Sequence, residues 1–239
     1  MSKASRTKHP VVSQKEWLAA RRALLAKEKE LTRQRDRLSE ERRALPWVKV
    51  EKDYVFDGPD GRQTLSELFE GRSQLLVYHF MYGPDWEEGC PSCSFWADNF
   101  NGAIEHLKAR DVTMIAVSRA PYRTLKAFQK RMGWSFKWVS SLGSDFNYDF
   151  HVSFTPEQQQ GKVFYNFEKQ EFPSDEAPGI SVFYKDGIGD VFHTYSAYSR
   201  GIDAVNGAYQ LLDLAPKGRD EAKLPWSMAW VRHRDKYGT

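Results

Sequence analysis

The sequence has 239 residues, of which 41% are hydrophobic and 14% aromatic, and it contains only two cysteines. This composition excludes a disordered chain and suits one sizeable globular domain with additions. No apolar run approaches the length of a membrane span, and the first residues lack the apolar segment of a secretory signal. The sparse cysteines fit a reducing compartment. We therefore expect a cytoplasmic protein without a membrane partner.

Charge is unevenly distributed along the chain. The formal net charge is +3, yet residues 1–50 contain 14 Lys and Arg against 6 Asp and Glu. An excess of basic residues is the first requirement for binding nucleic acid. Here the basic residues are interleaved with acidic ones in a helical pattern, so a nucleic-acid partner is not expected.

Residues 1–46 are predicted to form a basic helical arm. Ser13 and Glu16 have the spacing of a capping box, and no Gly or Pro follows before Pro46. Apolar residues recur every seven positions, at Trp17, Leu24, Leu31, Leu38 and Leu45. The positions three or four residues further on are mostly charged, which makes a poor two-stripe coiled coil. The helix is therefore expected to lie on its own domain or across a partner, as in a homodimer through residues 13–45.

Residues 47–81 lead to the segment that carries the chemistry. Two short extended pieces, 48–50 and 54–56, precede a strong turn signal, and 64–69 is predicted to be a short helix. The apolar run 75–81 predicts a buried strand. Gly83 and Pro84 then end this strand.

The two cysteines lie in the sequence Cys90-Pro91-Ser92-Cys93, after that strand and at the start of a helical pattern. A C-x-x-C pair at such a junction is typical of a redox site. The first turn of a helix has unpaired N–H groups and a partial positive charge, which stabilise an attacking thiolate. Pro91 suits the first helical position because its missing N–H costs nothing there. We expect Cys90 to be the nucleophile and Cys93 the buried resolving thiol.

Other interpretations of the pair are weaker. A structural disulfide would gain little from closing so small a loop. A zinc site needs further ligands, and no His pair follows at finger spacing, so no metal is expected. Two inert buried thiols would not account for the proline that opens the helix. No phosphate loop, dinucleotide fingerprint or hydrolase motif is present, so no cofactor is expected.

The remaining chain alternates helices and strands. We expect a helix at 92–110, strands at 112–117 and 136–139, a helix at 121–132, a hairpin of 180–185 with 191–195, and a helix at 203–213. This order predicts an α/β domain with parallel βαβ units and right-handed crossovers. Residues 142–177 are loop-rich and aromatic.

The order of these elements resembles a thioredoxin fold, and CPSC resembles the active site of the thioredoxin superfamily. The segment from VTMIAV to SDFNYDFHV is similar to the peroxiredoxin-like branch. Over nearly the whole chain, segments such as YHFMYGPDWEEGCPSCSFWADNFNGAI, GISVFYKD and LPWSMAW resemble a bacterial family of uncharacterised thioredoxin-like proteins, described as predicted dithiol–disulfide oxidoreductases. The resemblance implies a thioredoxin-like domain at 47–213, with a central mixed sheet and flanking helices. A C-terminal extension, 214–239, would pack on this domain.

The resemblance also singles out residues around the pair. Thioredoxin folds place a cis-proline opposite the cysteines, and Pro178 is the candidate, although its peptide bond is open to either isomer. Trp86 lies four residues before Cys90 and is a candidate to cover the pair and contact substrate, with ordinary loop packing as the alternative. Peroxiredoxins carry Thr three residues before the peroxidatic cysteine, where this chain has Glu87. That departure argues against efficient peroxide reduction.

Two further features have a functional and a structural interpretation. Arg119 follows the strand 112–117 at the edge where α/β proteins form their sites. It is a candidate to lower the pKa of Cys90 or to bind an anion, and a plain surface charge is the alternative. The aromatic stretch 144–151 either walls a small-molecule pocket near the cysteines or is a packed insertion.

Three functions are compatible with these residues. The first is a thiol–disulfide oxidoreductase that acts on a protein or small-molecule disulfide and is served by an unidentified reductant. The second is a peroxide reductase, in which Cys90 forms a sulfenic acid that Cys93 resolves. The third is a non-enzymatic thioredoxin-like binding module. The position of the motif at a strand–helix junction favours the first.

Overall fold

The computed structural model describes residues 9–238 and divides the chain into two compact units, Met1–Pro46 and Trp47–Thr239. The first unit contains one long helix, α1 (Gln14–Arg43). The Ser13 hydroxyl accepts from the Glu16 N–H at 3.3 Å, and the Glu16 carboxylate accepts from the Ser13 N–H at 2.9 Å. The predicted capping box is therefore confirmed.

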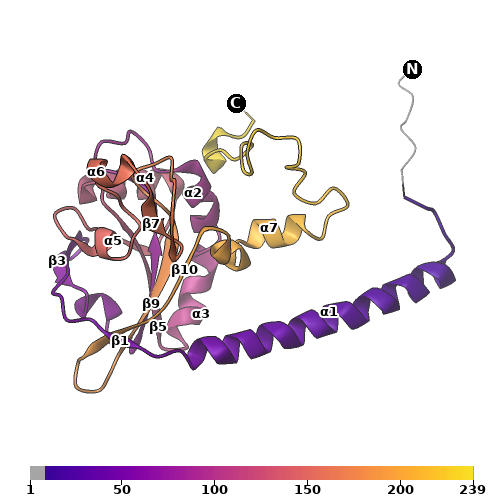
Figure 1. Ribbon diagram of the computed structural model, residues 1–239, viewed down its shortest axis with the longest axis horizontal. Helices are drawn as coiled ribbons and strands as arrows, with labels where there is room; N and C mark the ends of the chain where they lie inside the picture. Colours follow the sequence, from indigo (N-terminus) through magenta and orange to yellow (C-terminus); the bar gives the residue numbers. More distant parts are fainter. Residues whose placement is uncertain (1–8, 239) are drawn as a thin grey trace. The chain divides into compact units, whose positions relative to one another are not determined.

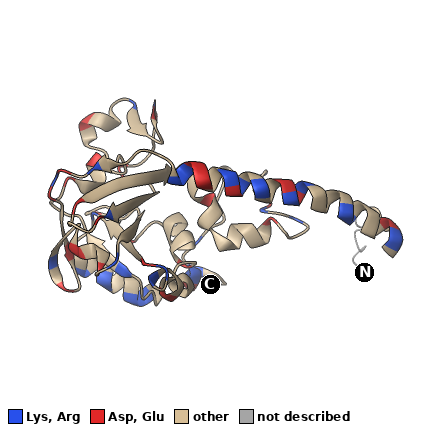
Figure 2. Cartoon of the chain, turned by 90° about the horizontal axis from the view of Figure 1, so that it is seen from below, with Lys and Arg blue, Asp and Glu red and all other residues tan. Residues whose placement is uncertain are grey.

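Helix α1 has an unburied apolar stripe. Four of the residues that recur every seven positions lie in α1 and the fifth, Leu45, follows it; each exposes 45–57% of its surface, and no residue of α1 is buried. Basic and acidic residues are interspersed along the helix between the apolar positions (Figure 2). No described helix is both long enough and apolar enough to cross a bilayer. A helix with such a stripe needs a complementary surface.

We expect α1 to pair with a second copy of the chain through this stripe. Replacing Leu31 with Glu, in the middle of the stripe, is expected to convert a dimer into a monomer because it places a charge in the apolar contact. Light scattering at micromolar concentration measures the change. Lys29→Glu, on the opposite side of the helix, is the matched control and should stay dimeric. A monomeric unaltered chain would contradict this prediction.

The second unit contains an eight-stranded mixed sheet in the order β1-β10-β9-β4-β5-β6-β2-β3. Strands β4 (Gln74–His79), β5 (Val112–Ser118) and β6 (Lys137–Ser140) are parallel. Strands β9 (Gly179–Lys185) and β10 (Val191–Tyr198) form an antiparallel hairpin (Figure 1). Strand β9 pairs with β4 in the antiparallel direction. The order β10-β9-β4-β5 with these directions is that of a thioredoxin fold. The predicted α/β thioredoxin-like fold class is thus confirmed.

The other elements of this unit are short, and those written η are 3-10 helices. In chain order they are β1 (Val48–Lys49), β2 (Val55–Gly58), β3 (Gly61–Thr64), η1 (Glu67–Phe69), α2 (Pro91–Ala97), η2 (Asn101–Ala103), α3 (Ile104–Lys108), α4 (Tyr122–Met132), α5 (Phe146–Asp149), α6 (Pro156–Gln159), β7 (Val163–Tyr165), β8 (Glu168–Gln170), η3 (Ser199–Val205), α7 (Gly207–Leu212) and η4 (Arg234–Lys236). Strands β7 and β8 pair only with each other.

The single helix predicted over 92–110 is wrong, because the segment forms α2, η2 and α3. The Asn99 side-chain amide donates to the carbonyls of Phe95 and Trp96, at 2.8 and 3.2 Å. The Asn99 backbone N–H then bonds to Trp96, in the tighter 3-10 pattern. A side chain that occupies helix carbonyls in this way competes with continuation of the helix.

The helix predicted over 203–213 is also divided, into η3 and α7. Asn206 has an extended backbone, and its side-chain oxygen caps α7 by accepting from the Tyr209 N–H at 3.0 Å. Asn is a preferred N-cap residue, so the break has a local cause. The segment 142–177, predicted to be loop-rich, holds α5, α6, β7 and β8.

Two apolar clusters cover the two faces of the sheet, because side chains alternate along each strand. Along β4, Tyr78 belongs to the cluster that α2 and α4 cover, and Val77 to the cluster that η1 and α5 cover. Cys93 lies in the first cluster. Near the C-terminus, Val231 and His233 are buried, with 4% and 2% exposure. The division at 213 between a domain and an extension stays a prediction.

Candidate functional site

Cys90 is the N-cap residue of α2, and Pro91 occupies the first turn, as the sequence predicted. The backbone N–H of Cys93 donates to the Cys90 sulfur at 3.5 Å. The Cys90 N–H donates to the Met81 carbonyl at 3.1 Å, which ties the start of the helix to the segment just after β4. Both cysteines are free thiols, Cys90 half-buried and Cys93 only 1% exposed. Cys90 is therefore the more exposed of the two residues, and Cys93 is covered.

The two thiols differ in acidity. A hydrogen bond from the Cys93 thiol lowers the pKa of Cys90 to about 7, helped by the N–H groups of Cys93 and Ser92 and opposed by burial. Burial raises the pKa of Cys93 well above its usual range, and its bond to Cys90 and the charge on Cys90 add to this. Near neutral pH, Cys90 is thus partly thiolate while Cys93 stays protonated.

The pH dependence of alkylation tests this asymmetry. The rate at which iodoacetamide modifies Cys90 is expected to rise with pH through about 7 and to level off above it, because only the thiolate reacts. Cys93→Ala removes the thiol that donates to Cys90 and should move the midpoint to higher pH. Cys93→Ser keeps a donor and should move it less. An unchanged midpoint in Cys93→Ala would show that Cys93 does not hold down the Cys90 pKa.

A cavity of about 220 Å³ lies beside Cys93, and Pro178 lines it. The Tyr165 hydroxyl donates to the Pro178 carbonyl at 2.7 Å and accepts from the Ser199 N–H at 2.9 Å. The Ala177–Pro178 bond is trans, as are the other described peptide bonds, so the cis alternative is wrong for this structure. Pro178 nevertheless borders the same cavity as the buried sulfur.

The inner wall of this cavity is formed by residues that sequence reasoning missed. The Tyr78 hydroxyl donates to the Cys93 carbonyl at 3.3 Å, and the Met81 N–H donates to the Cys93 sulfur at 3.4 Å. Both residues come from the apolar run that enters the loop, where the sequence indicates burial but not which side chain meets the cysteine. Their bonds fix the position of the resolving thiol.

Trp86 and Arg119 line a different cavity, of about 640 Å³. The Arg119 guanidinium donates to Glu176 at 2.5 Å and to Asp175 at 3.4 Å. Glu176 is 1% exposed, and burial raises its pKa to about 7 against the opposing effect of Arg119. Arg119 thus compensates the negative charge of the buried Glu176 carboxylate. Trp86 packs against the apolar cluster that includes Cys93.

His233, far along the chain, holds the loop before Cys90. Its Nε2 donates to the Gly89 carbonyl at 2.7 Å, and its Nδ1 lies 3.4 Å from a Glu88 oxygen. A Cβ at position 89 would lie 2.7 Å from the Phe80 ring and 3.1 Å from the Phe128 ring. Only glycine therefore fits between these rings, and its carbonyl is left facing the imidazole.

Cations surround the Glu88 carboxylate in the same loop. Lys236 donates to it at 2.7 Å and Arg131 at 2.5 Å, and Arg131 also binds Asp235 at 2.7 Å. Lys236 and then Arg131 lower the pKa of Glu88. The negative charge two residues before Cys90 is thus compensated, and it opposes the Cys90 thiolate less than an unpaired carboxylate would.

The aromatic stretch 144–151 contributes to the core on the other face of the sheet. Phe146 is fully buried and Phe150 nearly so, and both belong to the cluster that lacks the cysteines. The interpretation as a packed insertion holds for Phe146, whereas Phe150 is packed and also lines a cavity that shares no residue with the one beside Cys93. Within residues 9–238, no group of three or more His, Cys, Asp or Glu side chains is arranged to hold a metal ion.

A family model described as "Bacterial protein of unknown function (DUF899)" matches residues 6–237. The chain belongs to this family. The DUF899 chain resembles the solved peroxiredoxin Q of Xanthomonas campestris, with 16% identity and a TM-score of 0.44 over 66% of this chain and 90% of that one. It also resembles Peroxidoxin BcpB of Mycobacterium tuberculosis, with 13% identity and a TM-score of 0.45 over 69% and 96%. At these identities and TM-scores, the similarity does not indicate the activity of this chain.

No curated protein matches the DUF899 chain. The bacterial family that the sequence motifs indicated is thus confirmed. The function of this chain has to be inferred from the geometry of its site.

Proposed function

We propose that this protein is a thiol–disulfide oxidoreductase in which Cys90 attacks a substrate disulfide and Cys93 releases the product. One observation carries the proposal. A half-buried cysteine whose pKa is lowered to about 7 begins a helix, and it receives a hydrogen bond from a second, fully buried cysteine. This asymmetry between the two sulfurs is what sequential disulfide exchange requires.

The reaction has two exchange steps. The Cys90 thiolate attacks one sulfur of the substrate disulfide, the substrate S–S bond breaks, and the other sulfur leaves as a thiolate and takes a proton. Cys93 then loses its proton and attacks the Cys90 sulfur, which expels the second substrate thiolate. Two electrons pass to the substrate, and the products are two thiols and a Cys90–Cys93 disulfide.

The first step also prepares the second. One cause of the raised Cys93 pKa is the negative charge on Cys90. That charge disappears when Cys90 enters the mixed disulfide, so the Cys93 pKa falls at the stage when its thiolate is needed. The proposal includes a reducing, cytoplasmic setting, in which a dithiol or glutathione-type reductant returns the pair to the reduced state.

Equilibration in glutathione redox buffers tests the proposal. The full chain is incubated at a series of reduced-to-oxidised ratios, its free thiols are alkylated, and its mass is measured. We expect a reversible loss of two alkylatable thiols as the buffer becomes oxidising, and only a glutathione adduct on Cys90 in Cys93→Ser. Failure to form the Cys90–Cys93 disulfide at any ratio would refute the proposal.

Peroxide is not the expected oxidant. The residue three positions before Cys90 is Glu87, so no hydroxyl side chain is present there to orient a peroxide. The Tyr82 hydroxyl donates to the Glu87 carbonyl at 3.1 Å, which fixes this residue through its backbone. Hydrogen peroxide is therefore expected to oxidise the Cys90 thiolate no faster than it oxidises the thiolate of free cysteine, as stopped-flow rates corrected for the thiolate fraction of each would show.

A further inference from the structure

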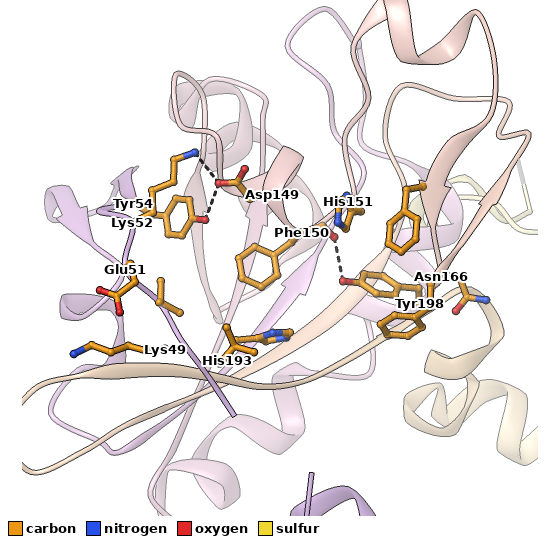
Figure 3. Close-up of a pocket in the computed structure, with 14 residues that line it drawn as sticks. Lys49, Glu51, Lys52, Tyr54, Asp149, Phe150, His151, Asn166, His193 and Tyr198 are labelled. Atoms are coloured by element: carbon orange, nitrogen blue, oxygen red, sulfur yellow. Dashed lines mark hydrogen bonds and ion pairs between the residues drawn. The ribbon is translucent and has the colours of Figure 1, made fainter. Parts of the chain in front are cut away.

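A cavity of about 470 Å³ lies apart from both cavities described above, with which it shares no lining residue. Its walls come from β1 and its connection to β2, the end of α5, the β7–β8 hairpin and strand β10 (Figure 3). Cavities of a few hundred Å³ with apolar walls and a few polar groups are the usual form of small-molecule sites.

Aromatic rings form much of the wall. They belong to Tyr54, Phe150, Phe164, Phe167 and Tyr198. Two of them are unusually exposed for large apolar side chains, Phe164 at 41% and Phe167 at 66%. The Phe167 ring lies 5.4 Å from that of Tyr198. Exposed rings at the rim of a cavity indicate a surface that a planar apolar molecule would cover.

The charges on the wall are already compensated or negative. Lys52 binds Asp149 at 2.8 Å, and Lys49 binds Asp190 at 2.5 Å. The Tyr54 hydroxyl also donates to Asp149, at 2.7 Å. Figure 3 shows the contacts of Asp149 at one end of the cavity. A cation that already binds a carboxylate offers little to an anion, so the wall disfavours a negatively charged ligand.

His193 offers the cavity an acceptor. Its Nε2 lies 3.1 Å from the Tyr195 carbonyl, and a carbonyl can only accept, so Nε2 carries the proton. The Nδ1 of the neutral ring is then an acceptor, and it has no partner among residues 9–238. Burial lowers the pKa of His193, which keeps the ring neutral.

A buried chain of hydrogen bonds holds this ring in place. His193 Nε2 lies 2.8 Å from the Ser196 hydroxyl, which lies 2.8 Å from that of Ser181, which in turn lies 2.8 Å from His79 Nε2. Ser181 is fully buried and His79 is 1% exposed. Burying polar groups is costly unless they are hydrogen-bonded, so the chain favours one orientation of the His193 ring, and the Tyr195 carbonyl then selects the tautomer.

We propose that this cavity binds an uncharged, planar aromatic molecule whose hydroxyl or N–H group donates to His193 Nδ1, with its ring between the aromatic walls. The aromatic rings determine the planar shape of the ligand. The paired lysines leave no free cation on the wall for a negatively charged ligand, and the free acceptor on His193 requires a donor group. This site shares no residue with the cavity beside the cysteine pair, so an experiment can refute it without refuting the proposed redox function.

Indole and 1-methylindole are matched probes, because they differ only in the N–H group. Titration calorimetry with the full chain is expected to show that indole binds and that methylation weakens binding about tenfold, as loss of one hydrogen bond implies. The imidazole NMR signals of His193 should shift with indole. His193→Phe should remove the difference between the probes while both still bind.

Two controls locate the site and test its charge preference. Val50→Trp, which adds a ring at the wall, should abolish binding of both probes while leaving the circular dichroism spectrum and the Cys90 alkylation rate unchanged. Indole-3-acetate should bind more weakly than indole. The proposal is overturned if indole does not bind at millimolar concentration, if methylation has no effect, if Val50→Trp binds normally, or if the carboxylate binds as well as indole.

Discussion

Replacing Cys90 with Ser is expected to abolish disulfide reduction, with a loss of roughly 10³-fold or more, because a hydroxyl is not ionised near neutral pH and cannot replace the attacking thiolate. The rate is measured with a small aromatic disulfide as substrate and excess thiol as reductant. The fold should be unaffected, because Cys90 is a half-buried cap residue and Ser is itself a preferred N-cap.

Cys93→Ser is the matched variant for this experiment. It keeps the nucleophile and loses the resolving thiol, so the mixed disulfide between Cys90 and the substrate is expected to accumulate in a single turnover. Mass spectrometry of the acid-quenched protein detects it. If Cys93→Ser turned over normally, or if Cys90→Ser formed the adduct instead, the assignment of roles to the two sulfurs would be wrong.

Replacing His233 with Ala is expected to destabilise the protein by about 2–4 kcal/mol, since it removes a buried ring and leaves the Gly89 carbonyl without its donor. Urea unfolding measures the free energy. The pH midpoint for alkylation of Cys90 is also expected to move, because the loop that positions this cysteine loses an anchor.

Two further variants show whether His233 only stabilises the fold or also positions Cys90. His233→Gln keeps an N–H donor and should restore the Cys90 midpoint better than it restores stability. Lys223→Ala, at an exposed position in the same C-terminal stretch, should change neither quantity. An unchanged Cys90 midpoint in His233→Ala would show that the imidazole stabilises the fold without positioning the nucleophile.

The parts of this protein that local patterns determine were predictable from its sequence. The capping box of α1 and the place of Cys90 at the start of α2 each depend on residues three apart, which a helix brings together. The strands β4 and β5 are apolar because they are buried on both faces. The fold class followed from the alternation of such strands with helices.

Other features depend on side-chain contacts that cannot be predicted from the spacing of neighbouring residues. Asn99 and Asn206 divide predicted helices because their side chains bond to the backbone instead of to water. Arg119 was placed at the correct edge of the sheet, but its partner Glu176 comes from a distant loop. His233 meets Gly89 across 144 residues of chain, and a lone histidine near a C-terminus gives no signal of this.

That last contact has a consequence for biosynthesis. The ribosome completes the sheet and releases Cys90 from its tunnel long before it adds His233 and Lys236, which anchor the loop of the nucleophile. A nascent chain that lacks His233 and Lys236 would therefore carry an unanchored cysteine loop, and the redox pair would reach its final geometry only after both residues have been added and have folded back onto this loop.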